Sequence, residues 1–70
     1  MQEVIDRWVK DVATASNARE VVDIHSKLQE HRSQYPDFVR LVTFSCHDRF
    51  AAALAEVYAI PVERASRYLV

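Results

Sequence analysis

The sequence predicts an all-α fold: a small single domain over residues 1–70, built from four helices with a long central third helix. Three observations predict it. Apolar residues recur three and four positions apart, which is the spacing of one helix face. Glycine is absent, so the tight turns of β-hairpins, which need a positive φ, are disfavoured. The two prolines, Pro36 and Pro61, stand where helices are expected to begin.

The first helix is expected over residues 2–13. Its apolar face is formed by Val4, Ile5, Trp8, Val9 and Val12. Charged residues occupy the other side, as in an amphipathic surface helix. The polar run of residues 14–17 then ends the helix.

The second helix is expected to begin after Asn17 and to run to about His31. Asn17 is a favourable N-cap, and Glu20 stands three residues later, which completes a capping box. The apolar positions of this helix are Val21, Val22, Ile24 and Leu28.

The third helix is expected to be the longest and to cover residues 36–58. Pro36 suits the first turn, and Asp37 favours the positive end of the helix. The predicted apolar stripe comprises Phe38, Leu41, Val42, Ser45, Cys46, Arg49, Phe50, Ala53, Leu54 and Val57. Asp48 lies beside this stripe and is expected to be partly buried. Its neighbours three and four positions away include no cation, so its partner must come from another helix or another molecule.

A short fourth helix is expected from Pro61 to about Leu69, because the residue before a proline is pushed out of the helical region. Val62, Ala65, Tyr68 and Leu69 are its possible packing residues. A helix this short is marginal alone in water, so it must dock on the third helix or fray.

Composition restricts the possible functions. The hydrophobic core of a domain this small contributes only about 3–5 kcal/mol of net folding stability. Self-association or binding of a partner could add to that stability. The single cysteine, Cys46, excludes an internal disulfide, and no cofactor or metal motif is visible. A net charge of −1 disfavours strong nonspecific DNA binding. No apolar run approaches a membrane span and no signal-peptide core is visible, which predicts a cytoplasmic protein.

Cys46, His47 and Asp48 form a run that resembles a catalytic set. Consecutive helix residues project about 100° apart, so the three are not expected to converge on one substrate. We therefore expect no enzyme: Cys46 is interpreted as a small core residue and the histidines as solvated or hydrogen-bonded rather than metal-binding. Trp8 is expected to pack in the core or close its edge, with anchoring of a partner as the alternative.

Asp48 is the strongest functional candidate, and two interpretations stay open. In one, the carboxylate pairs within the chain with Arg7, Lys10 or Arg49. In the other, it waits for an arginine that a partner protein supplies. In either case, removing one member of the desolvated pair would leave a buried charge unpaired. This would weaken folding in the first interpretation and partner binding in the second.

The C-terminal stretch LAEVYAIPVERASRYL is similar to a helix-turn-helix. Arg64 and Arg67 would then lie on the outer side of the second helix and contact nucleic acid. Ala59 occupies the turn position that usually holds glycine, and the expected recognition helix is very short.

The chain also resembles the Hha/YmoA family of small enterobacterial gene-expression modulators. The resemblance is best over residues 42–54 and 58–68. It rests on Val42, Phe44, Ser45, Asp48, Ala52 and Leu54, followed by Ile60-Pro61 and the aromatic Tyr68. Cys46-His47 stands where the family has two alanines. The order of the helices, with a very short one after a proline, is similar as well.

The resemblance implies a protein partner, since family members bind the N-terminal region of H-NS-type nucleoid proteins through acidic residues. That role carries over to Asp48, while Arg19 and Glu20 compete for the position of a second acid. The candidate partner-binding residues are Asp48, Phe44, Arg49, Ala52 and Glu20.

The first functional hypothesis is a non-enzymatic transcription modulator that docks on an H-NS-like protein and contacts DNA at most indirectly. The second is a phage- or plasmid-encoded helical homodimer that inhibits another host regulator. The third is a small helix-turn-helix DNA-binding protein. Neither a cofactor nor a membrane is expected in any of them.

Overall fold

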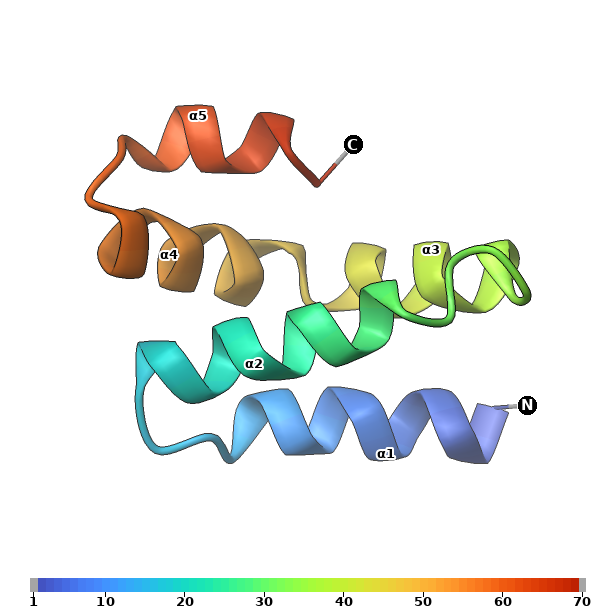
Figure 1. Ribbon diagram of the computed structural model, residues 1–70. Helices are drawn as coiled ribbons and strands as arrows, with labels where there is room; N and C mark the ends of the chain where they lie inside the picture. Colours follow the sequence, from blue (N-terminus) through green and yellow to red (C-terminus); the bar gives the residue numbers. More distant parts are fainter. Residues whose placement is uncertain (1, 70) are drawn as a thin grey trace.

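The computed structural model describes residues 2–69, and that range is entirely helices, turns and loops. The helices are α1 (Gln2–Ala13), α2 (Ala18–Gln29), α3 (Pro36–Ser45), α4 (His47–Tyr58) and α5 (Val62–Arg67). Figure 1 shows α1 and α5 at opposite sides, with α2 and the row formed by α3 and α4 between them. The predicted all-α class is confirmed over the described residues.

The two N-terminal helices follow the sequence pattern closely. Ile5 and Val12 of α1 are buried, whereas Val4 is 49% exposed at the predicted apolar face. The N-cap of α2 forms as predicted, because Asn17 Oδ1 accepts a hydrogen bond of 2.9 Å from the Glu20 N–H. The Glu20 carboxylate accepts from the Ser16 N–H at 2.8 Å, which is one residue before the donor of an ordinary capping box.

The predicted long helix over residues 36–58 is wrong, because it is interrupted at Cys46. This residue has φ −110° and ψ 18°, near the sparsely populated bridge region, and it separates α3 from α4. Residues 43–48 are Thr, Phe, Ser, Cys, His and Asp, all of which belong to the weaker helix formers. Residues 2–69 therefore form five helices rather than the four expected.

The buried side of α3 and α4 also differs from the predicted stripe. Leu41, Ser45 and Arg49 were expected within it, but all three are exposed. The buried residues of the two helices are Phe38, Val39, Val42, Thr43, Phe50, Ala51, Ala53 and Leu54. The difference arises because α1 packs mainly against α3 whereas α2 packs mainly against α4, so two partners cover a wider strip.

The core draws on α1 to α4 and also includes Ala65 of α5. The largest fully buried side chains are Val12 of α1, Leu28 of α2, Val42 of α3 and Phe50 of α4. The Cα radius of gyration is 11.4 Å, close to the value of about 11 Å expected for a compact chain of this length. The helices α1 and α2 therefore cover one side of α3 and α4, and α5 covers a further side of α4 (Figure 1).

The last helix docks on α4, as its short length requires. Ala59 ends α4 in the left-handed conformation, with φ 54° and ψ 48°, and the Ile60 N–H bonds to the Ala55 carbonyl at 3.1 Å. Pro61 then starts α5 in an extended conformation, and Ala65 is completely buried. Val62 and Tyr68, which were expected to pack, are instead 54% and 70% exposed.

Candidate functional site

Asp48 lies in the first turn of α4 with its side chain fully exposed to solvent. The prediction that it is partly buried is wrong, because the interruption at Cys46 makes it a helix-start residue on the outer side. An acid in a first turn is stabilised by the helix dipole and needs no buried partner. Among residues 2–69 its one neighbour at ion-pair distance is the His47 ring, whose Nδ1 lies 3.6 Å from the Asp48 Oδ1.

The intramolecular pairs considered for Asp48 do not form in the described part of the chain. Within residues 2–69, the Asp48 carboxylate forms no ion pair with Arg7, Lys10 or Arg49. A partner arginine therefore remains the alternative. In the free protein the Asp48 carboxylate is hydrated, so replacing it should not destabilise the fold. The desolvation cost arises only when the partner binds and excludes water from the carboxylate.

Phe44, Asp48 and Ala52 are exposed on α3 and α4, and so is Leu41. We call these four residues the α3–α4 face. Phe44 is 81% exposed and Leu41 is 50% exposed. The Cys46 N–H bonds to the Val42 carbonyl and the Phe50 N–H to the Cys46 carbonyl, at 3.0 and 2.9 Å. The first bond closes the last turn of α3 and the second opens the first turn of α4, so the two helices meet at Cys46.

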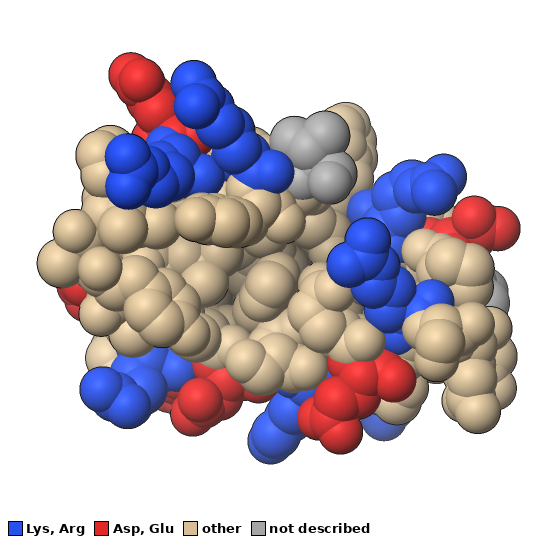
Figure 2. Space-filling view, turned by 45° about the horizontal axis from the view of Figure 1, so that its top comes forward, with Lys and Arg blue, Asp and Glu red and all other residues tan. Residues whose placement is uncertain are grey.

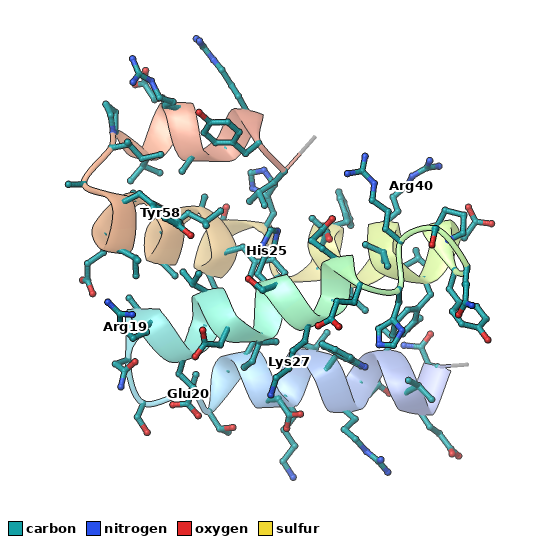
Figure 3. All side chains as sticks on the ribbon, in the orientation of Figure 1. Arg19, Glu20, His25, Lys27, Arg40 and Tyr58 are labelled. Atoms are coloured by element: carbon teal, nitrogen blue, oxygen red, sulfur yellow. The ribbon has the colours of Figure 1, made fainter. Side chains whose placement is uncertain are left out.

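Not all predicted site residues join this face. Arg49 is exposed beside Asp48, as the sequence order requires. Glu20 lies at the start of α2 and already caps the Ser16 N–H (Figure 3). Arg64 and Arg67 are exposed on α5, a helix of six residues. Of the predicted partner-binding residues, Phe44, Asp48, Arg49 and Ala52 are exposed on α3 and α4, whereas Glu20 lies on α2.

The run Cys46-His47-Asp48 does not form a nucleophilic site. Cys46 is only 3% exposed, and burial raises the pKa of its thiol although the nearby Arg49 charge opposes this. A neutral, buried thiol is a poor nucleophile. His47 and Asp48 do approach each other, but Cys46 points into the core, as its interpretation as a core residue predicts.

The other histidines make packing contacts. The His25 ring stands edge-on to Phe50, with centroids 5.0 Å apart, and burial lowers its pKa. The His31 ring lies 6.0 Å from that of the half-buried Trp8, which also contacts Phe38. Within residues 2–69, no group of three His, Cys, Asp or Glu side chains could hold a metal ion.

Charge is distributed in separate groups on the face seen in Figure 2. Lys and Arg side chains lie at the upper left, at the right and along the lower edge of this face, with Asp and Glu side chains among them, and a broad, hollowed surface without charges lies in the middle. A continuous basic surface, as expected of a protein that binds DNA mainly through phosphates, is not present on this face. The exposed Arg64 and Arg67 are therefore a local feature of α5.

A pocket that the sequence pattern did not indicate lies where α2, α3 and the C-terminal end of α5 meet. Its walls include Gln29, Arg32, Arg40, Thr43 and Leu69, and its volume is about 520 Å³. These residues come from three separate segments, so no local spacing could have grouped them. Only the spacing of Arg40 and Thr43, three residues apart on α3, could have indicated that two of the pocket residues share a helix side.

No helix of the described chain is long and apolar enough to cross a membrane. Comparison with protein-family models, with curated proteins and with solved structures finds no significant match. The candidate sites therefore rest on geometry and chemistry alone.

Proposed function

We propose that this protein is a non-enzymatic binding module that docks another protein through the α3–α4 face. The observation that carries the proposal is Phe44, an aromatic residue 81% exposed, four residues before the fully exposed carboxylate of Asp48. A single exposed apolar residue needs no explanation, but Phe44 and Leu41 are both exposed near an acid that pairs with no Lys or Arg of residues 2–69.

The partner that this face suits carries an apolar groove and an arginine. Phe44 and Leu41 would supply most of the affinity, since burying one such side chain is worth about 1.5–3 kcal/mol. Asp48 would accept the paired hydrogen bonds of a guanidinium, which fixes orientation and speeds association. The resemblance to the Hha/YmoA family makes an H-NS-type nucleoid protein the first partner to test, with modulation of transcription as the consequence.

The test is a titration of the ¹⁵N-labelled protein with the N-terminal fragment of an H-NS protein. Amides around Phe44 and Asp48 should shift, and Phe44→Ala should weaken binding by about 10- to 100-fold. Tyr58→Ala is the matched control, because Tyr58 is also an exposed aromatic residue but lies at the far end of α4 (Figure 3). Absence of shifts at high micromolar concentration would reject the H-NS partner.

Asp48→Asn separates recognition from folding. Because the side chain is fully exposed, the variant should keep its helical circular-dichroism signal while binding the partner about 10-fold or more weakly. Asp23→Asn, at another exposed acid, should leave binding unchanged. Unfolding of Asp48→Asn would assign a structural role to the carboxylate and contradict the proposal.

Two further measurements distinguish the remaining hypotheses. Light scattering reports whether the α3–α4 face is instead covered by a second copy of the chain. A gel shift with random duplex DNA and its salt dependence tests Arg64 and Arg67, and a slope near zero excludes binding dominated by phosphates.

A further inference from the structure

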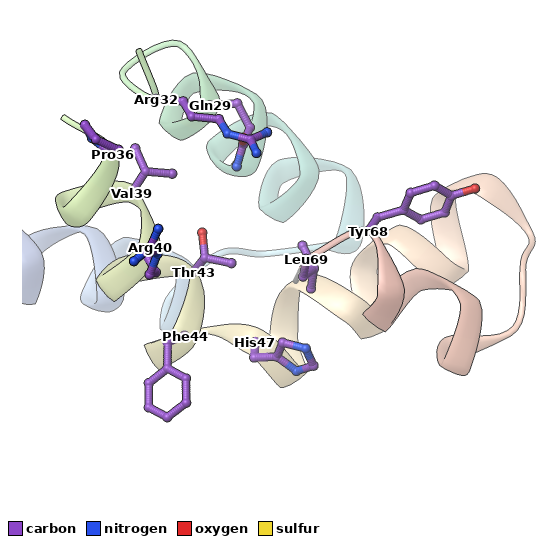
Figure 4. A pocket seen from close by; sticks show the side chains of 10 residues that line it. All are labelled: Gln29, Arg32, Pro36, Val39, Arg40, Thr43, Phe44, His47, Tyr68 and Leu69. Carbon is purple, nitrogen blue, oxygen red and sulfur yellow. The ribbon is translucent and has the colours of Figure 1, made fainter. Parts of the chain in front are cut away.

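The pocket between α2, α3 and the end of α5 is built from both polar and apolar side chains. Figure 4 shows Arg32 and Gln29 on one side of it, Arg40 and Thr43 on another, and Leu69 at its end. Its volume of about 520 Å³ falls in the range of small-molecule sites, which is roughly 300–1,000 Å³. The space is therefore large enough for a metabolite-sized ligand.

The charge of this pocket is positive. Arg32 and Arg40 both line it, and no Asp or Glu does. Neither arginine belongs to an ion pair with another residue of the range 2–69. Two guanidinium groups that share one concave surface attract anions, and each can bind an oxyanion through two parallel N–H donors.

Thr43 supplies an independent observation. The residue is only 9% exposed, and Figure 4 shows its hydroxyl oxygen on the side of the pocket where Gln29 and Arg32 lie. None of the side-chain hydrogen bonds within residues 2–69 involves this hydroxyl. The hydroxyl is accessible from the pocket rather than enclosed in the core, so it is free to donate a hydrogen bond to an anion bound there.

Most of the remaining lining is apolar or aromatic. Val39 is almost completely buried, and Pro36, Phe44, Tyr68 and Leu69 also line the pocket, together with the His47 ring. A bare inorganic ion would leave this surface in water, whereas a ligand with an apolar part would cover it.

We propose that this pocket binds a small organic anion, with its phosphate or carboxylate group held by Arg32, Arg40 and the Thr43 hydroxyl. The apolar part of the ligand lies against Val39 and Leu69. The pocket meets the α3–α4 face at Phe44, which lines both, whereas Asp48 and Ala52 are not part of the pocket.

The test uses two aromatic anions of similar size, phenyl phosphate and benzoate, added to the ¹⁵N-labelled full chain at constant ionic strength. Benzamide, which is neutral, is the matched control. Saturable shifts of the Thr43 and Arg40 amides with either anion, but not with benzamide, support the proposal. The tighter of the two anions identifies the group, phosphate ester or carboxylate. Binding that does not saturate at millimolar concentration, or equal binding of benzamide, overturns it.

Two variants assign the roles. Arg40→Gln should weaken binding by about 10- to 100-fold, because it removes a charged hydrogen-bond donor. Thr43→Val keeps the shape of the side chain and should weaken binding by about 3- to 10-fold. Its melting temperature should not fall, since the hydroxyl makes no hydrogen bond within residues 2–69. A drop in melting temperature without a loss of affinity would make the hydroxyl structural and contradict the assignment.

Arg19→Gln and Asp48→Asn complete the design. Arg19 is an exposed arginine at the opposite end of α2, and its replacement should leave anion binding unchanged (Figure 3). Asp48→Asn should impair docking of the partner protein and keep anion binding within about twofold. Conversely, Arg40→Gln should leave docking intact, so failure of either proposal can be recognised without the other.

Discussion

Replacing Ala59 by glycine should stabilise the protein. Ala59 is an L-residue with a side chain at φ 54°, and the left-handed region costs such a residue roughly 1–2 kcal/mol. Glycine avoids this cost but loses about 0.5–1 kcal/mol more backbone entropy on folding. Ala59 is exposed, so removing its methyl group sacrifices little packing. The net gain expected for Ala59→Gly is about 0.5–1 kcal/mol.

Ala52→Gly is the matched control for this prediction. Ala52 is also exposed and lies in the middle of α4, where glycine is less favourable than alanine by about 1 kcal/mol. Both variants introduce the same residue, so the change in unfolded-chain entropy is common to both. What differs is the conformation that the folded chain imposes at the two positions.

Thermal unfolding followed by circular dichroism measures both effects. In a domain of this size, 1 kcal/mol corresponds to a shift of about 4–8 °C in the melting temperature. Ala59→Gly should raise the melting temperature by about 2–8 °C, and Ala52→Gly should lower it by about 4–8 °C. Shifts of the same sign and size would refute the reasoning, because they would mean that position 59 carries no left-handed cost.

Two other predictions concern α2. Asn17→Ala removes the acceptor of the Glu20 N–H at the start of α2 and should destabilise the fold by about 1 kcal/mol in urea titration; an unchanged midpoint would mean that water replaces the cap. Burial lowers the pKa of His25 below its ordinary value of 6.5 in the folded state, so the unfolded chain binds the proton first. Above pH 6.5 the His25 ring is neutral in both the folded and the unfolded chain, and the fold keeps its full stability. As the pH falls from 6.5 through the lower pKa of the folded state, the unfolded chain gains the proton first and stability is lost. Between about pH 7.5 and 5.5, His25→Gln should show a shallower loss of stability than the wild type, and parallel curves would contradict this.

Much of the fold could be predicted because it depends on local rules. The N-cap of Asn17, the helix start near Pro36 and the end of α4 before Pro61 all follow from the conformational preferences of single residues. The left-handed Ala59 occupies the position where a glycine would be usual. These signals act within a few residues and do not depend on the neighbours that the fold supplies.

The candidate sites were less predictable. Phe44, Asp48 and Ala52 were expected at a binding surface from their spacing and from the family resemblance, and all three are exposed. The environment of Asp48 was misjudged, because a continuous helix would have placed it beside an apolar stripe. The pocket around Thr43 and Arg40 could not be foreseen, since its other walls come from α2 and from the end of the chain.

The sequence by itself determined which segments are helical, where most of them begin and end, and that Cys46 and Phe50 face the interior. These properties follow from backbone preferences and apolar periodicity, which are encoded locally. Only the tertiary structure decided that the chain bends at Cys46, that Asp48 faces water, and that Arg32 and Arg40 share a pocket. Those outcomes depend on how α1 and α2 pack against α3 and α4, and packing between distant segments is set by the shape of the whole core rather than by any one stretch.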